Sequence, residues 1–174
     1  MLQKGTPAPD FELYCTPDQK IRLSDLKGKR VILAFYPADW SPVCSDQMAL
    51  YNETLKLFHR HNAEVIGISV DSKWCHMAFS QDRKLHFPLL ADFEPKGKVA
   101  KLYDVYNENE GECRRALFVI DEEGIIYADI DLSKCIQPKQ MHDILGHYNR
   151  FDIFDLRVNV APTKKITFIN KSEE

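Results

Sequence analysis

The sequence predicts an α/β fold in which a mixed β-sheet is flanked by helices on both faces. Short apolar runs typical of buried strands alternate with amphipathic helical segments between residues 31 and 103. An antiparallel hairpin is predicted at residues 117–128, and a closing helix begins at Pro138 and continues to Tyr148. Parallel strands need crossover helices, whereas a hairpin joins antiparallel strands, so the sheet should contain both kinds of pairing.

The strongest strand signal is the run Val31–Tyr36, which is continuously apolar and rich in β-branched and aromatic residues. Such a run predicts a strand that is buried on both faces, and it stops at Pro37. A polar turn at residues 24–29 precedes it. Further upstream, the short alternating run Phe11–Tyr14 predicts an edge strand.

A helix is predicted from Val43 to about His61, because apolar residues recur there every three to four positions, as in Met48, Tyr51 and Leu55. The other predicted elements are a strand at 64–70, a helix containing Trp74 that ends near Lys84, a strand at 89–91, a helix at 98–103, and hairpin strands at 117–120 and 125–128 around a turn that ends in Gly124.

The chain length of 174 residues suits one domain, to which we assign residues 1–150. After Arg150 the pattern changes to short β-like runs divided by Pro162. Residues 151–174 are therefore predicted to form a C-terminal extension that packs on the domain or on a second subunit.

The composition is that of an ordinary globular protein, with 44% hydrophobic and 28% charged residues. The 23 basic and 26 acidic residues give a net charge of -3, which argues against nucleic acid or an anionic membrane as a partner. No run approaches the roughly 18 apolar residues of a membrane span, and no apolar run follows the lysine near the N-terminus. We therefore expect a cytoplasmic protein.

The five cysteines are an odd number without a CxxC pair, so structural disulfides are not expected. Pairs such as His59 with His61 and His142 with His147 do not combine with a carboxylate or thiol at a metal-ligand spacing. All six histidines are assigned to solvated faces, and neither a metal nor another cofactor is expected.

The segment most informative about chemistry is the loop from Pro37 into the predicted helix. It places Cys44 in the first helical turn, where unpaired N–H groups and the helix dipole stabilise a thiolate, the nucleophilic form of cysteine. The N–H groups of Val43 and Cys44 are expected to bind substrate oxygens. The hydroxyl of Ser41, three residues earlier, can bond both the thiolate and the substrate. The alternative is that Ser41 caps the helix and Cys44 is a small buried side chain.

The pattern Pro37-x-x-x-Ser41-x-x-Cys44, within the string YPADWSPVCS, resembles the active-site signature of the peroxiredoxins, the alkyl hydroperoxide reductase and thiol-specific antioxidant family. The segments APDFEL, EVIGISVDS, FPLLAD and RRALFVIDEEGII are also similar to family segments and occur in the usual order, so the resemblance covers about residues 3–149. It implies a thioredoxin-like fold and a thiol-dependent peroxidase activity on hydroperoxides.

The resemblance also implies roles for individual residues. Cys44 would be the peroxidatic cysteine, Ser41 would occupy a position usually held by threonine or serine, and Pro37 would shield the thiolate. Arg115, immediately before the LFVID strand, would lie beside Cys44 and stabilise its thiolate. Gln47 departs from the family, in which glutamate is common, although glutamine can still accept a hydrogen bond from arginine.

Recycling requires a thiol that attacks the oxidised Cys44. Cys135, in a predicted loop before the last helix, resembles the resolving cysteine of atypical two-cysteine peroxiredoxins, and Cys75 is a weaker candidate. Packing or surface roles are favoured for Cys15 and for Cys113, which is predicted to lie in an exposed acidic loop.

The implied partners are a hydroperoxide, a thioredoxin-like or low-molecular-weight thiol reductant, and a second subunit in a homodimer. Two other functions stay open at this point: a thioredoxin-fold thiol-disulfide oxidoreductase, which the absence of CxxC disfavours, and a non-catalytic chaperone or interaction module.

Overall fold

The computed structural model describes residue 2 and residues 4–131. The predicted helix from Pro138, the extension at 151–174, the domain boundary at residue 150 and Cys135 lie outside the described residues.

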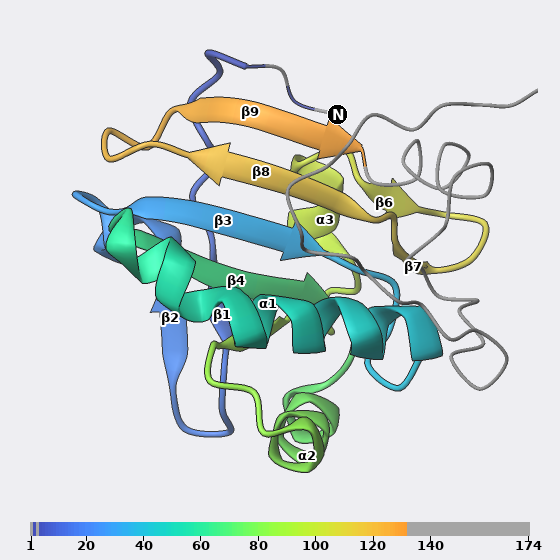
Figure 1. Cartoon of the computed structure of the whole chain (residues 1–174). Coiled ribbons are helices and arrows are strands. Elements are labelled where there is room, and N and C mark those ends of the chain that lie inside the picture. The colour runs from blue at the N-terminus through green and yellow to red at the C-terminus, as the bar shows by residue number, and fades with distance from the viewer. Residues whose placement is uncertain (1, 3, 132–174) are drawn as a thin grey trace, which may run out of the picture. The chain divides into compact units, whose positions relative to one another are not determined.

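A mixed sheet forms the centre of the fold (Figure 1). Within the described residues it has seven strands in the order β2-β1-β5-β4-β3-β8-β9. Strand β3 pairs parallel with β4 and antiparallel with β8, and β4 pairs parallel with β5. The strand bounds are β1 Glu12–Tyr14, β2 Lys20–Arg22, β3 Arg30–Phe35, β4 Ala63–Ser69, β5 Leu89–Ala91, β8 Ala116–Ile120 and β9 Ile126–Asp131.

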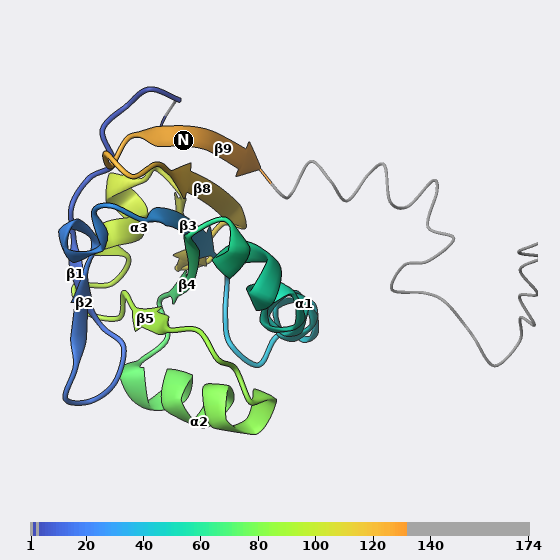
Figure 2. The same cartoon turned by 60° about the vertical axis from the view of Figure 1, so that its left-hand side comes forward.

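Helices cover both faces of the sheet, as Figures 1 and 2 show for α1 and α3. Helix α1 (Pro42–Arg60) and α2 (Lys73–Arg83) share one hydrophobic cluster, which includes Met48 and Phe79. Helix α3 (Lys98–Leu102) contributes Val99 to a second cluster. A short 3₁₀ helix, η1 (Leu23–Leu26), precedes β3.

The side chains of β3 alternate between the two clusters. Val31, Leu33 and Phe35 pack in the cluster with α3, whereas Ile32 packs with the cluster of α1 and α2. Successive side chains of a strand point to opposite faces, so a strand covered by helices on both faces must be apolar throughout. The predicted mixed α/β fold and its buried central strand are confirmed.

Two details of the predicted sheet are wrong. β1 is not an edge strand, because it lies between β2 and β5; its contact with β5 is a single residue pair, Tyr14 with Ala91. Edge strand β2 was not predicted, and neither was the small sheet formed by β6 (Tyr106–Asn107) and β7 (Glu112–Cys113). These strands have only two or three residues, too few to show an alternating pattern.

No helix within residues 4–131 is both long enough and apolar enough to cross a membrane.

Buried side chains of Leu89 in β5 and of Tyr36 pack closely against Gly67 in β4. A Cβ atom there would lie 2.6 Å from Leu89 Cδ2 and 3.2 Å from Tyr36 Cε1, both of which are buried. The close approach of these side chains therefore requires glycine at this position.

The variant Gly67→Ala should lower the free energy of unfolding by about 1–3 kcal/mol, because an added methyl group overpacks a closed core. Chemical denaturation of the variant and wild type measures the difference. An unchanged unfolding midpoint would contradict this account of the close packing.

Candidate active site

The loop that leaves β3 leads directly into α1. Ser41 is the N-cap residue with an extended backbone, and Pro42 is the first residue of the helix. Proline is favoured there because its fixed φ suits the helix and its missing N–H would have no helical partner. Cys44 is the third helical residue and is 0% exposed. The predicted helix start and the place of Cys44 in the first turn are confirmed.

The hydroxyl of Ser41 makes no capping hydrogen bond. Only its carbonyl oxygen is used, accepting from the Ser45 N–H at 2.8 Å. The capping alternative considered from the sequence is therefore wrong for the side chain. Ser41 is half-buried and lies three residues before Cys44 in the chain.

The pairing of β3 with β8 places Arg115 at the end of β3 that leads to Cys44. Phe35, the last residue of β3, pairs with Ala116, the first residue of β8. Arg115 immediately precedes Ala116, so it lies at the end of β3 from which the Cys44 loop departs.

Arg115 is hydrogen-bonded to α1. Its Nη1 donates to Gln47 Oε1 at 3.0 Å, and Gln47 Nε2 donates to the Tyr51 hydroxyl at 2.7 Å. Cys44, Gln47 and Tyr51 are three and four residues apart, so they share one helix face. The guanidinium group is therefore held on the face that carries Cys44, and glutamine accepts its hydrogen bond as predicted.

The environment of Tyr51 also shows the influence of Arg115. Burial raises the pKa of the Tyr51 hydroxyl, while its hydrogen bond to Gln47 and the positive charge of Arg115 act in the opposite direction. The preceding residue, Arg114, is exposed. The geometry thus favours Arg115 over Arg114.

A buried hydrogen-bond network lies behind the loop. The Tyr36 hydroxyl donates to Asp39 Oδ1 at 2.6 Å, and His76 Nδ1 lies 2.9 Å from Asp39 Oδ2. Burial, followed by the negative charge of Asp39, raises the pKa of Tyr36, so the phenol stays protonated and donates. His76 is 1% exposed, which contradicts its assignment to a solvated face. The sequence contained no local sign of this network, because Asp39 and His76 are 37 residues apart.

Cys75 lies on α2 close to two carboxylates. Potential metal-ligand atoms of Asp39, Asp71 and Cys75 lie within 4.8 Å of one another. Protein donors already bond both carboxylates: Tyr36 donates to Asp39, and Ser69 Oγ donates to Asp71 Oδ2 at 2.7 Å. Burial, followed by the charges of Asp39 and Asp71, raises the pKa of the Cys75 thiol to about 11.

The other described cysteines belong to segments other than the Pro37–Ser41 loop and α1. Cys113 is 1% exposed in β7, so its predicted exposed position is wrong. Burial is also the main cause that raises its pKa. Cys15 is half-buried beyond β1, and its thiol donates to the Gln19 carbonyl at 3.5 Å. Neither residue is joined to the network around Asp39 by a hydrogen bond between side chains.

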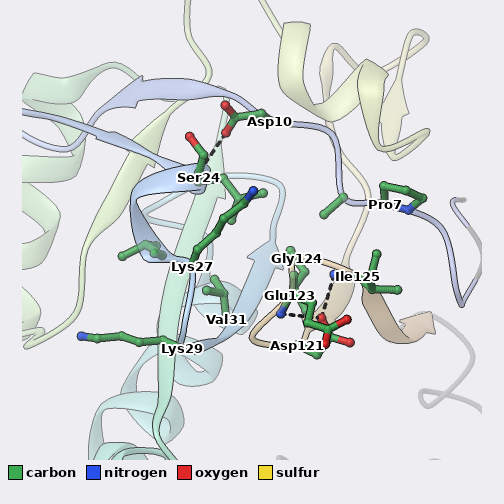
Figure 3. A pocket seen from close by; sticks show the side chains of 14 residues that line it. Pro7, Asp10, Ser24, Lys27, Lys29, Val31, Asp121, Glu123, Gly124 and Ile125 are labelled. Atoms are coloured by element: carbon green, nitrogen blue, oxygen red, sulfur yellow. Dashed lines mark hydrogen bonds between the residues drawn. The ribbon is translucent and has the colours of Figure 1, made fainter.

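A pocket with a volume of about 250 Å³ lies near the start of β3, at the end opposite to the Cys44 loop (Figure 3). Val31 lines it near the start of the strand, together with Lys27 and Asp121, whereas the Cys44 loop follows the strand's end. Asp121 Oδ1 is occupied by the N–H groups of Glu123 and Ile125. This pocket is separate from the candidate active site.

Comparison with known proteins identifies the family. The AhpC/TSA family model matches residues 4–128. Peroxiredoxin-1 of Gallus gallus is 41% identical over 169 residues, which cover 91% of this chain and 83% of the relative. The mitochondrial thioredoxin-dependent peroxide reductase of Drosophila melanogaster is 39% identical over 130 residues, which cover 69% of this chain and 55% of that protein.

Solved structures agree with this result. The reduced 2-Cys peroxiredoxin of Plasmodium vivax matches with a TM-score of 0.68 and 27% identity, over 82% of this chain and 99% of that chain. A yeast mitochondrial 1-Cys peroxiredoxin matches with a TM-score of 0.67 and 26% identity, over 86% of this chain and 83% of that chain. The resemblance seen in the sequence is confirmed: the chain belongs to the AhpC/TSA family and is a thiol-dependent peroxidase of the peroxiredoxin type.

Proposed function

We propose that Cys44 is the peroxidatic nucleophile of this thiol-dependent peroxidase. The observation that carries the proposal is its position in the first turn of α1, on the helix face to which Arg115 is hydrogen-bonded through Gln47. Unpaired N–H groups at a helix start and a nearby guanidinium both favour a thiolate. The thiolate is the form of cysteine that attacks an electrophilic oxygen.

In the proposed reaction, the Cys44 thiolate attacks the terminal oxygen of a hydroperoxide. A sulfur–oxygen bond forms and the oxygen–oxygen bond breaks, so the cysteine is oxidised to a sulfenic acid. The remaining oxygen leaves with the electron pair and takes up a proton, forming an alcohol, or water when the substrate is hydrogen peroxide. The N–H groups of Val43 and Cys44 and the guanidinium of Arg115 stabilise the charge on that oxygen.

We assign supporting roles to two loop residues. Ser41 supplies a hydroxyl that is not consumed by helix capping and can orient the peroxide beside Cys44. Pro37 follows Tyr36, the fully buried residue after β3, and shields the thiolate from water.

For recycling, we propose that Cys135 attacks the sulfenic acid, forming a disulfide and releasing water. Cys75 is disfavoured, because a thiol with a pKa of about 11 is almost entirely protonated at neutral pH. Cys44 is completely buried, and a disulfide requires Cα atoms within about 7 Å. The first turn of α1 must therefore unwind before any resolving thiol reaches Cys44.

For the external reductant, we propose a thioredoxin-like protein or a low-molecular-weight thiol. We further propose a homodimer, supported by the exposed apolar side chains of Trp40, Val43 and Trp74 near the starts of α1 and α2. A cytoplasmic location is proposed because an odd number of cysteines without a CxxC pair suits a reducing compartment.

The variant Cys44→Ser should lose peroxidase turnover down to the uncatalysed rate, because a hydroxyl is a far weaker nucleophile at neutral pH. Peroxide consumption with a thiol reductant measures this loss, and circular dichroism checks that the fold is kept. Cys15→Ser is the matched control and should retain turnover. Near wild-type turnover in Cys44→Ser would reject Cys44 as the nucleophile.

The variant Arg115→Met should slow peroxide attack by about tenfold to a hundredfold, the effect of removing a charge-assisted hydrogen bond. Stopped-flow oxidation measures the rate, with exposed Arg114→Met as the control. Equal rates in both variants would count against Arg115.

The rate at which iodoacetamide alkylates Cys75 should rise by about tenfold per pH unit between about pH 7.5 and about pH 9.5, because only the thiolate reacts. This range lies below the raised pKa of about 11. Peptide mass spectrometry follows the reaction. Asp71→Asn removes a negative charge that raises this pKa, so the variant should react faster at a given pH. A plateau below pH 9 in wild type would refute the account.

Peroxide treatment should produce a peptide in which Cys44 is cross-linked to Cys135 in monomeric material under non-reducing conditions. The variant Cys135→Ser should instead accumulate the sulfenic or sulfinic acid of Cys44, because its intramolecular partner is missing. A cross-link to Cys75, an intersubunit disulfide, or a stable sulfenic acid in wild type would each exclude Cys135. The last result would indicate a one-cysteine enzyme recycled by an external thiol.

A further inference from the structure

The ring of His76 is enclosed between two hydrogen-bond acceptors. Its Nδ1 lies 2.9 Å and 3.0 Å from the two carboxylate oxygens of Asp39, and its Nε2 lies 3.1 Å from the carbonyl oxygen of Leu90. Asp39 is 0% exposed and His76 is 1% exposed. The three residues come from the loop after β3, from α2 and from β5.

This arrangement determines the charge of the ring. A carbonyl oxygen only accepts, so Nε2 must carry a hydrogen. An ionised Asp39 carboxylate also only accepts, so beside it Nδ1 carries a hydrogen as well and His76 is an imidazolium. The single hydrogen of the Tyr36 hydroxyl is directed to Asp39 Oδ1 at 2.6 Å, rather than to Nδ1 at 3.5 Å.

The surroundings favour the charged pair. Asp39 receives hydrogen bonds from Tyr36 and His76, and donors to a carboxylate stabilise its ionised form. Asp71 adds a second negative charge nearby, while the raised pKa of Cys75 keeps that thiol neutral. The alternative, a neutral ring with the proton on Asp39, lacks the attraction between opposite charges in this dry site.

We propose that His76 is a positioning residue for peroxide reduction: as an imidazolium, it holds Asp39 and thereby fixes the Pro37–Ser41 loop around Cys44. The inference rests on the proposed role of Cys44. Asp39 lies midway between Pro37 and Ser41, two residues from each. Its N–H also donates to Asp71 Oδ2 at 2.9 Å, so the loop is held by main chain and side chain together.

Loss of the imidazolium would leave the Asp39 carboxylate buried without its cation. Such a charge is strongly destabilising, so the loop must shift to bring Asp39 to water or to another donor. Pro37 and Ser41 then move with it. Displacements of about 1 Å at a reacting centre can reduce rates by about a hundredfold.

The charge of His76 can be measured directly by nitrogen NMR of protein labelled with ¹⁵N at histidine. At neutral pH both ring nitrogens of His76 should carry hydrogen, with the shifts of an imidazolium, and the exposed ring of His86 serves as the comparison signal. A neutral His76 ring with hydrogen on Nε2 alone would overturn the proposal. This result does not depend on which cysteine reacts, so it separates failure of the positioning role from failure of the proposed function.

The effect on catalysis is tested with the rate of Cys44 oxidation by hydrogen peroxide, with the oxidised residue identified by peptide mass spectrometry. His76→Leu should be slower than wild type by about tenfold to a hundredfold. His86→Leu, a matched change at an exposed histidine, should leave the rate unchanged. A wild-type rate in His76→Leu would overturn the proposal.

Rescue distinguishes an ion pair from simple packing. Adding Asp39→Asn to His76→Leu removes the uncompensated buried charge, while the amide oxygen can still accept from Tyr36, so the double variant should recover part of the rate and of the melting temperature. Equal rates in the single and double variants would overturn the proposal. If His76→Leu does not fold, His76→Asn, which keeps a donor near the Nδ1 position, takes its place with the same expected rescue.

Discussion

The position of β3 between a parallel neighbour and an antiparallel neighbour determines where the chemistry is assembled. The end of β3 meets the end of β4 on one side and the start of β8 on the other, so three connections meet at one edge of the sheet. They carry the Pro37–Ser41 loop, Asp71 and Arg115, respectively. Strand pairing thus brings residues that are distant in sequence to one place. Hydrogen bonds between their side chains then complete the site.

The packing of α1 against the sheet fixes the position of the Cys44 side chain. Cys44, Met48 and Leu55 are buried in one cluster with Tyr36, so the helix is anchored to the sheet along the face that begins with the cysteine. The helix start that favours a thiolate is therefore also a core position. The same burial explains why peroxide reduction and resolution place different demands on the loop, since a second thiol needs far more space than a peroxide.

Much of the fold could be predicted from local patterns. The run Val31–Tyr36 and the period of α1 are long, apolar signals that tertiary context reinforces. The place of β1 could not be predicted, because its neighbour β5 is distant in sequence and touches it through one residue pair. Cys113 was misassigned because acidic neighbours indicated exposure, whereas a two-residue strand turns its thiol into the core.

The candidate site also contains residues that could be predicted from the sequence and one that could not. Cys44, Ser41 and Pro37 occur within eight consecutive residues, so the sequence contained their relation, and the family resemblance pointed to Arg115. His76 escaped notice because its partners, Asp39 and the Leu90 carbonyl, come from two other elements. A buried histidine looks like a solvated one in sequence until the acceptors around it are known.

The most direct test of the central claim is to add one equivalent of hydrogen peroxide to the reduced wild-type protein in the presence of a reagent that traps sulfenic acids. Peptide mass spectrometry then locates the label. We predict that the label appears on Cys44 and not on Cys15, Cys75 or Cys113. Labelling of another cysteine first, or peroxide consumption that leaves Cys44 neither labelled nor in a disulfide, would contradict the account.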